Sequence, residues 1–266
     1  MPAITDPASG LQFFELSHPW GYFSPIPPGY DDLRIIRVAN HARSGTMTQR
    51  IAGVMHFSTH VNAPIHLVAG AATVDRIPLE HFFGNGVVLA IPKAKWGVVS
   101  AEDLAVAQPQ VRPGDMVVIV TGWHRRYSDS RAYFGHAPGL ADEAAAWLIE
   151  RKVRLVAMDT PSIDHPMATS LAGHRNGPKM KGLAQEYEAE TGRGAMADFP
   201  HWNAAHRRLL EAGIPTIENV GGDADEVAGS RCAFQAMPWR WTEGDACVVR
   251  LVAMRDPGGS YRLEAG

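Results

Sequence analysis

One stretch decides the fold of this chain, and it reads Met55-His56-Phe57-Ser58-Thr59-His60-Val61-Asn62-Ala63-Pro64-Ile65-His66. Its even-numbered positions include three histidines and an asparagine: His56, His60, Asn62 and His66. Side chains alternate between the two faces of a strand, so an extended segment would place these four on one face. Most of the odd-numbered residues are apolar and would face the core. Because imidazole is a common metal ligand, we expect this face to hold a metal ion.

A helix is the alternative for this stretch, because His56 and His60 are four residues apart. The helical zinc motif HExxH needs a glutamate after the first histidine, and this chain has Phe57 there. Pro64 would also break the next helical turn. We therefore predict a strand that runs into a loop. Scattered histidines in a polar segment are the other alternative, but three in register with an asparagine favour a metal site.

The composition excludes several classes of protein. The chain has 266 residues, of which 45% are hydrophobic and 20% charged, with a formal net charge of −3. This suits a soluble globular protein and provides no basic surface for nucleic acid or a membrane. Two cysteines, Cys232 and Cys247, are too few for a disulfide framework. The first residues lack the pattern of a signal peptide, and no apolar run reaches the ~18 residues of a membrane helix. We expect a cytoplasmic protein.

The rest of the chain alternates strands with helices. Residues 33–42 and 46–56 predict a hairpin around Ser44-Gly45 that leads into the histidine stretch. Further strands are expected at 87–91, 116–121, 155–158, 215–220, 232–237 and 246–254. Residues 140–152 and 202–212 predict helices, and 183–190 a shorter one. This order predicts an α/β protein without internal repeats or a domain linker, so we expect a single domain over residues 1–266.

Two segments differ from this pattern. Residues 1–31 are rich in proline, glycine and aromatics and predict an irregular N-terminal arm, packed on the body or reaching an active site or a neighbouring subunit. Trp20 and Phe23 of this arm are candidate substrate contacts for a flat ring. Residues 165–200 predict a lid or specificity loop, or else a disordered segment. His174 and Arg175 could bind a substrate carboxylate there, unless the loop is simply a solvated basic surface.

The histidine stretch resembles the motif H-x-G-T-H-x-D-x-P-x-H of the cyclase family of metal-dependent hydrolases, which includes bacterial kynurenine formamidase and isatin hydrolase. Looser matches follow in the family's order: Leu16-Ser17-His18-Pro19, then Asp159-Thr160-Pro161-Ser162-Ile163-Asp164, then the segment from His206 to Glu218-Asn219. By themselves His206 and Glu218 would more often be a solvated helix residue and an ion-paired strand residue. Their place in this series gives them weight.

The resemblance implies roles for particular residues. His56, His60 and the residue at position 62 correspond to metal ligands, and His206 and Glu218 to the other half of the metal site. His66 corresponds to a catalytic proton shuttle that does not bind the metal. The implied fold is a central β-barrel-like mixed sheet flanked by helices, and the implied assembly is a homodimer or homotetramer.

Two residues depart from the motif. Ser58 replaces glycine, which should still permit a tight strand. Asn62 replaces an aspartate whose two oxygens could bridge two ions, and it offers one neutral oxygen instead. We therefore expect one tightly bound divalent ion, Zn²⁺ or Mn²⁺, with a second ion weak or absent.

The expected activity is hydrolysis, in which metal-activated water opens a small cyclic amide, imide or lactone and His66 carries the proton. An arylformamidase of the kynurenine formamidase type is the first alternative. A metal-dependent lyase or dehydratase is the second. A non-catalytic metal- or ligand-binding protein, in which Asn62 marks lost chemistry, is the third.

Overall fold

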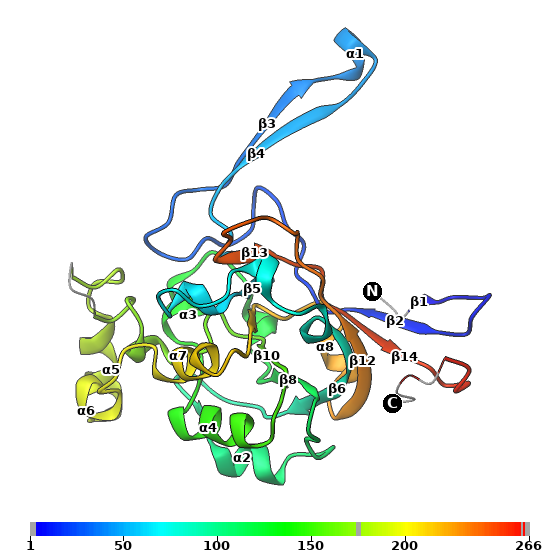
Figure 1. Cartoon of the computed structure of the whole chain (residues 1–266). Coiled ribbons are helices and arrows are strands. Elements are labelled where there is room, and N and C mark those ends of the chain that lie inside the picture. Colours follow the sequence, from blue (N-terminus) through cyan, green and yellow to red (C-terminus); the bar gives the residue numbers. More distant parts are fainter. Residues whose placement is uncertain (1–3, 174–176, 262, 264–266) are drawn as a thin grey trace.

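The computed structural model describes residues 4–173, 177–261 and 263, and this part of the chain is built on one mixed sheet (Figure 1). The sheet has 10 strands in the order β1-β2-β14-β12-β6-β8-β10-β11-β5-β13. In that order they are Ile4–Thr5, Gln12–Glu15, Val252–Arg255, Ser230–Gln235, Phe83–Ala90, Met116–Val120, Leu155–Met158, Thr216–Glu218, His60–Asn62 and Ala246–Val248. The sheet curls into a half-barrel flanked by helices, which confirms the predicted α/β fold with a barrel-like mixed sheet.

The centre of the sheet is parallel. Strands β6, β8, β10 and β11 run in the same direction, and their connections pass through α2 (Ala101–Val106), α4 (Asp142–Glu150) and α7 (Ala204–Glu211). Strands buried on both faces form continuous apolar runs, and β8 reads Met-Val-Val-Ile-Val. Val117 and Ile119 pack in the core beneath these helices, whereas Val118 and Val120 belong to the core on the opposite face.

The remaining elements are short and connect or cover the sheet. The helices are α3 (Arg131–Gly135) and α8 (Ala224–Val227), with single 3-10 turns η1 (Pro64–His66), η2 (Val74–Arg76), η3 (Leu79–His81) and η4 (Trp123–Arg126). A separate two-stranded sheet joins β7 (Val98–Val99) to β9 (Gly139–Leu140). No helix of the described residues is long and apolar enough to cross a membrane.

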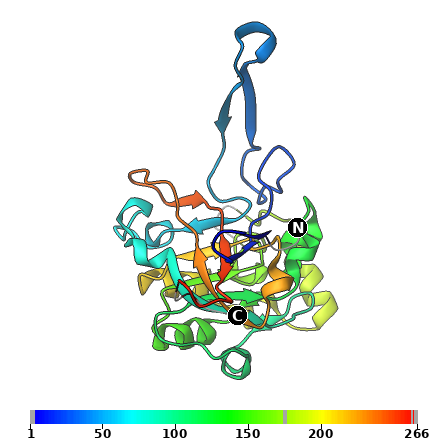
Figure 2. The ribbon, with the colours of Figure 1, turned by 90° about the vertical axis from the view of Figure 1, so that its right-hand side faces the viewer.

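The predicted hairpin is present as a ribbon that projects from the body (Figures 1 and 2). It consists of β3 (Arg34–Ala39) and β4 (Thr48–Ala52), with α1 (His41–Ser44) at its tip. The ribbon ends at Ala52, so it does not continue into the histidine stretch as the sequence predicted. The N-terminal segment is also more regular than expected, because β1 and β2 add two strands to one edge of the sheet.

The predicted strand at 246–254 is two strands rather than one. Strand β13 pairs with β5, whereas β14 pairs with β12 and β2 near the other end of the strand order. One straight strand cannot reach both sets of neighbours, so the chain bends between Val248 and Val252. The two halves hold together opposite parts of the curled sheet.

The described residues of the segment 165–200 pack on the body through their own apolar cluster. The segment contains η5 (Pro166–Ala168), α5 (Leu183–Thr191) and α6 (Ala195–Asp198). Leu183 and Tyr187 are buried beside Trp96 and Trp123 of the body. His174 and Arg175, the predicted carboxylate-binding residues, lie outside the described residues.

Candidate metal centre

Strand β5 brings the centre of the histidine stretch between two other strands. It pairs with β11 on one side and β13 on the other, so that His60 lies opposite both Glu218 and Val248. Asn62 lies opposite Thr216 and Ala246 in the same register. The sheet therefore places Glu218 on one flank of the histidines and Asp245, directly before β13, on the other.

The even numbering of the histidines predicted that they share one face of a strand. In the structure they do not. Strand β5 spans only His60–Asn62, His56 lies in the bend before it, and His66 ends the 3-10 turn that Pro64 begins. Ser58, at the motif's glycine position, adopts a positive φ of 53°, so the chain turns tightly there. Turns on both sides of β5, and not strand alternation, direct the rings toward one another.

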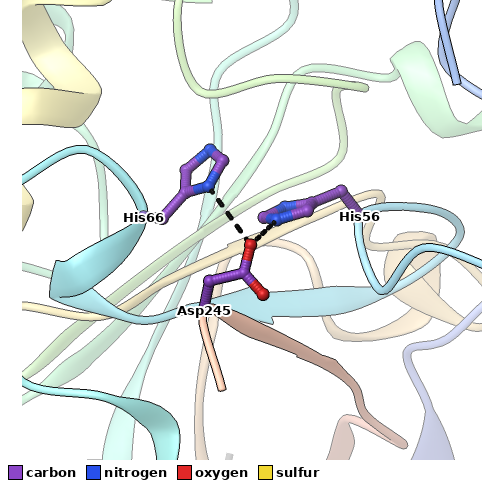
Figure 3. Close-up of side chains that lie close together, drawn as sticks. All are labelled: His56, His66 and Asp245. Atoms are coloured by element: carbon purple, nitrogen blue, oxygen red, sulfur yellow. Dashed lines mark hydrogen bonds and ion pairs between the residues drawn. The ribbon is translucent and has the colours of Figure 1, made fainter. Parts of the chain in front are cut away.

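His56 lies between an amide and a carboxylate. Its Nδ1 is 2.8 Å from Asn62 Oδ1. Its Nε2 is 2.8 Å from Asp245 Oδ2 (Figure 3). The adjacent His56, followed by His66, holds the pKa of Asp245 well below its usual range. Burial lowers the pKa of His56, which favours the neutral ring. A neutral imidazole carries one N–H and so cannot donate to both partners.

His60 repeats this arrangement with the other carboxylate. Its Nδ1 is 2.9 Å from the Ser58 carbonyl oxygen, which accepts the ring N–H, and its Nε2 is 3.2 Å from Glu218 Oε2. Glu218 Oε1 accepts a hydrogen bond of 3.0 Å from the Ile163 backbone N–H. Burial alone would raise the pKa of Glu218, but the adjacent His60 and His206 outweigh it and hold the pKa well below its usual range.

His206 completes the set from helix α7. Its Nε2 lies 2.8 Å from Thr216 Oγ1, and its Nδ1 lies 3.6 Å from Glu218 Oε1. Burial lowers the pKa of His206 to about 3, so the ring is neutral and its free lone pair is available. The His206 ring centroid is 5.8 Å from that of His66, which connects the two halves of the predicted site.

These donors fit a divalent cation. His56, His60 and His206 each have one ring nitrogen held by a protein oxygen and the other directed at a carboxylate, the arrangement typical of metal-binding histidines. A lone pair facing a carboxylate is unfavourable without a cation between them, and His60 Nε2 is buried with no hydrogen-bond partner among the described residues. Asp245 and Glu218 supply two negative charges to balance such an ion. All five predicted ligand positions thus lie in this cluster.

His66 is held less closely than the other three histidines. Its Nδ1 is 3.9 Å from Asp245 Oδ2, and its side chain is 23% exposed, against 1% for His60. Its ring centroid lies 4.1 Å from that of His56. Among the described residues, the ligand atoms of His56, His66 and Asp245 form a group that lies within 4.8 Å of one another (Figure 3).

The cluster opens into a cavity of about 410 Å³. His56, His66, His206 and Glu218 line one part of it. The rest is largely apolar and includes Tyr30, Phe134, Leu67 and Trp202, with Lys179 from the 165–200 segment. The cavity is large enough for a small ring compound.

The predicted substrate contacts in the N-terminal arm lie elsewhere. Trp20 packs against Phe57, with ring centroids 5.3 Å apart, in a separate groove of about 570 Å³. Phe23 is 99% exposed. The arm reaches the cavity through Pro27 to Tyr30 instead.

Asp245 was not predicted from the sequence. It follows Gly244 directly before the expected strand at 246–254, and this position gives no sign of chemistry. The signal that could have found it is the pairing of that strand with the histidine strand, since Ala246 lies opposite Asn62.

Comparison with known proteins identifies the family. The family model described as "Putative cyclase" matches residues 14–165, more than half of the chain, and the protein belongs to this family. Isatin hydrolase A from Labrenzia aggregata has a similar structure, with a TM-score of 0.73, 22% identity, and coverage of 93% of this chain and 95% of that one.

Two further solved structures show the same fold. Isatin hydrolase A from Ralstonia solanacearum has a TM-score of 0.72 and 19% identity, and the match covers 92% of each chain. A predicted metal-dependent hydrolase from Bacillus stearothermophilus has a TM-score of 0.66 and 19% identity, with 92% of this chain and 98% of that one covered.

Proposed function

We propose that this protein is a metal-dependent hydrolase that opens a small cyclic amide, imide or lactone. The observation that carries the proposal is the convergence of His56, His60 and His206, each with one nitrogen held by a protein oxygen, on the carboxylates of Asp245 and Glu218. Family membership and the fold of isatin hydrolases support the reaction class.

The ion and the protein have separate tasks in this proposal. A bound divalent ion would polarise the substrate carbonyl and lower the pKa of water from ~15.7 toward ~7. His66 would accept the proton of the attacking water and deliver it to the leaving nitrogen or oxygen, help that is typically worth ~10²–10⁴-fold in rate. Its greater exposure and its place at the cavity wall suit this task. Imidazole and carboxylate donors together suit Zn²⁺ or Mn²⁺.

The cavity supports a flat, mainly apolar substrate. Tyr30, Phe134 and Trp202 offer aromatic surface, and Lys179 offers a positive charge at the wall. This charge would attract a carboxylate, which ring opening of a cyclic amide or lactone produces. An arylformamidase is the second candidate, because a formylated aromatic amine would fit the same apolar wall.

Metal analysis and product analysis test the proposal together. We expect purified protein to carry about one divalent ion per chain and to lose activity on chelation. A panel of isatin-type lactams, cyclic imides, lactones and N-formyl aromatic amines would be incubated in ¹⁸O-water. Hydrolysis places one label in a new carboxylate, or in formate for a formamidase.

Two results would reject this function. One is the absence of a stoichiometric divalent ion together with chelator-resistant activity. The other is turnover without incorporation of ¹⁸O, which would favour a lyase or dehydratase that uses the same ion.

A further inference from the structure

Position 62 of the chain lacks the carboxylate of the family motif, and another carboxylate lies beside it. Asp245 immediately precedes β13, whose Ala246 is the register partner of Asn62. The Ala63 backbone N–H donates a hydrogen bond of 2.9 Å to the Asp245 carbonyl oxygen, which fixes the two segments side by side. The sheet therefore holds Asp245 on the strand next to the position from which the carboxylate is missing.

The side chain of Asn62 is already engaged with a histidine. Its Oδ1 accepts a hydrogen bond of 2.8 Å from His56 Nδ1. A histidine held in this way at Nδ1 presents its Nε2 lone pair to a metal, and an oxygen that orients a ligand ring is typical of the outer shell of metal sites. His56 Nε2 faces Asp245 Oδ2 and not Asn62.

We propose that Asp245 replaces the motif aspartate as the carboxylate ligand of the divalent ion, binding it together with His56 Nε2, while Asn62 orients His56 and does not bind the ion. The inference deepens the proposed function and rests on it in one respect, that a divalent ion is bound at this site. It assigns to the two residues roles that the motif alone would not provide.

The charges of the site support the exchange. An aspartate at 62 together with Glu218 would give the site two negative charges. With Asn62 and Asp245 the site again has two carboxylate groups, because Asp245 Oδ2 lies 2.8 Å from His56 Nε2. The Asp245 carboxylate is 49% exposed, so an ion can reach it from solvent.

Metal binding by three variants tests this assignment. Chelator-treated wild type, Asp245→Asn, Glu243→Gln and the double variant Asn62→Asp/Asp245→Asn would be titrated with Zn²⁺, Mn²⁺ and Co²⁺ by calorimetry. Glu243→Gln is the matched control, since it removes one negative charge from the same loop at an exposed position. The visible absorption of the Co²⁺-loaded proteins reports the ligand set without any reference to activity.

We expect Asp245→Asn to lose affinity for the ion by ~100-fold or more, beyond the ~10–100-fold usual for an outer-shell partner, and to change the Co²⁺ spectrum. Glu243→Gln should bind as wild type does. The double variant should regain most of the affinity, because a carboxylate returns at position 62. Circular dichroism and melting of the metal-free proteins would verify that each variant folds.

Wild-type affinity and an unchanged Co²⁺ spectrum in Asp245→Asn would overturn the inference and leave the proposed function standing. A double variant that folds but binds no better than Asp245→Asn would overturn the replacement of position 62 by position 245. A wild-type protein that binds no divalent ion would overturn the inference and the proposed function together.

Discussion

His66 differs chemically from the other histidines of the cluster because its ring is not fixed at both ends. His56, His60 and His206 each use one nitrogen on a protein oxygen at 2.8–2.9 Å. Among the described residues, the polar contact of the His66 ring is the 3.9 Å distance between its Nδ1 and Asp245 Oδ2. The ring also borders the cavity. A ring that must take up and release a proton during each turnover needs this freedom, whereas a metal ligand needs the opposite.

Replacing His66 with alanine should separate proton transfer from metal binding. We expect His66→Ala to lower kcat by ~10²–10⁴-fold with the hydrolysed substrate, because general acid–base catalysis is lost. Its metal content should equal that of wild type. The measurements are steady-state kinetics and metal analysis on the same preparation. His41→Ala, which removes an exposed histidine of the projecting ribbon, is the control. Near-full turnover of a metal-loaded His66→Ala enzyme would contradict the proposed role of His66.

The candidate site divides into residues that the sequence could predict and residues that it could not. His56, His60 and His66 are close in the chain, so their spacing alone suggests shared chemistry, and the resemblance adds His206 and Glu218. Asp245 is far along the chain and meets His56 only because β13 pairs with β5. Single-sequence patterns predict strands but not which strands become neighbours, so a ligand supplied by strand pairing cannot be predicted in this way.

Among the elements, the segment 165–200 shows how a predicted loop is fixed to the body. His165 begins η5: its Nδ1 accepts a hydrogen bond of 3.2 Å from the Met167 backbone N–H, and its Nε2 lies 3.2 Å from the Trp96 carbonyl oxygen. Its ring stacks on Phe199 at a centroid distance of 4.0 Å. One side chain thus joins both ends of the segment to the body. Whether the segment closes over the cavity as a lid remains a prediction.

His165 should make the stability of the protein depend on pH. His165 is 1% exposed, and its burial lowers the pKa of the ring from 6.5 to about 4. Asp198 raises this pKa and Arg193 lowers it, both by less than burial does. Below pH 6.5 the His165 ring binds a proton in the unfolded chain but stays neutral in the folded protein. The contribution of His165 to the free energy of unfolding is therefore complete above pH 6.5. It is lost as the pH falls toward 4, by up to ~3 kcal/mol.

The variant His165→Asn tests this dependence. Asparagine can accept the hydrogen bond from Met167 but does not titrate. We expect urea unfolding to show a smaller loss of stability between pH 6.5 and pH 4 than in wild type. Other buried groups, among them His18 and His206 with lowered pKa values and Asp164 with a raised one, titrate in both proteins alike, so the difference between the two slopes reports His165. Equal slopes for both proteins over this range would show that His165 is not the titrating group.

At the scale of the whole molecule, the sequence predicted the kinds of element and their order, and the structure determined their neighbours. Strand β10 at Leu155–Met158 and helix α7 at Ala204–Glu211 lie where periodicity placed them. The division of 246–254 into β13 and β14 could not be predicted, because both halves are apolar in the same way. The curl of the sheet separates the two halves, because it places β5 beside β13 and β2 beside β14.

The projecting ribbon is the part of the molecule whose stability is least explained by contacts within a single chain. An isolated two-stranded hairpin is marginally stable in water. This one carries Ile36, Val38, Met47 and Ile51, each about half-exposed (49%, 51%, 52% and 50%). Apolar side chains lie on both of its faces, because Ile51 is the register partner of Ile35 and Ile36 is that of Arg50. Phe23, at 99% exposure, adds another uncovered ring nearby in the chain.

We predict that a second copy of this chain covers the ribbon, as in the homodimer or homotetramer that the family resemblance implies. We expect light scattering after gel filtration to give a mass of at least two chains. Ile36→Lys/Val38→Lys should shift the protein toward the monomer, because both changes place charge on one apolar face. Thr48→Lys, which adds a charge to the same ribbon without removing apolar surface, should stay assembled. A wild-type protein that is monomeric at every concentration would show that the ribbon serves no contact between copies, and its exposed isoleucines would then need another partner.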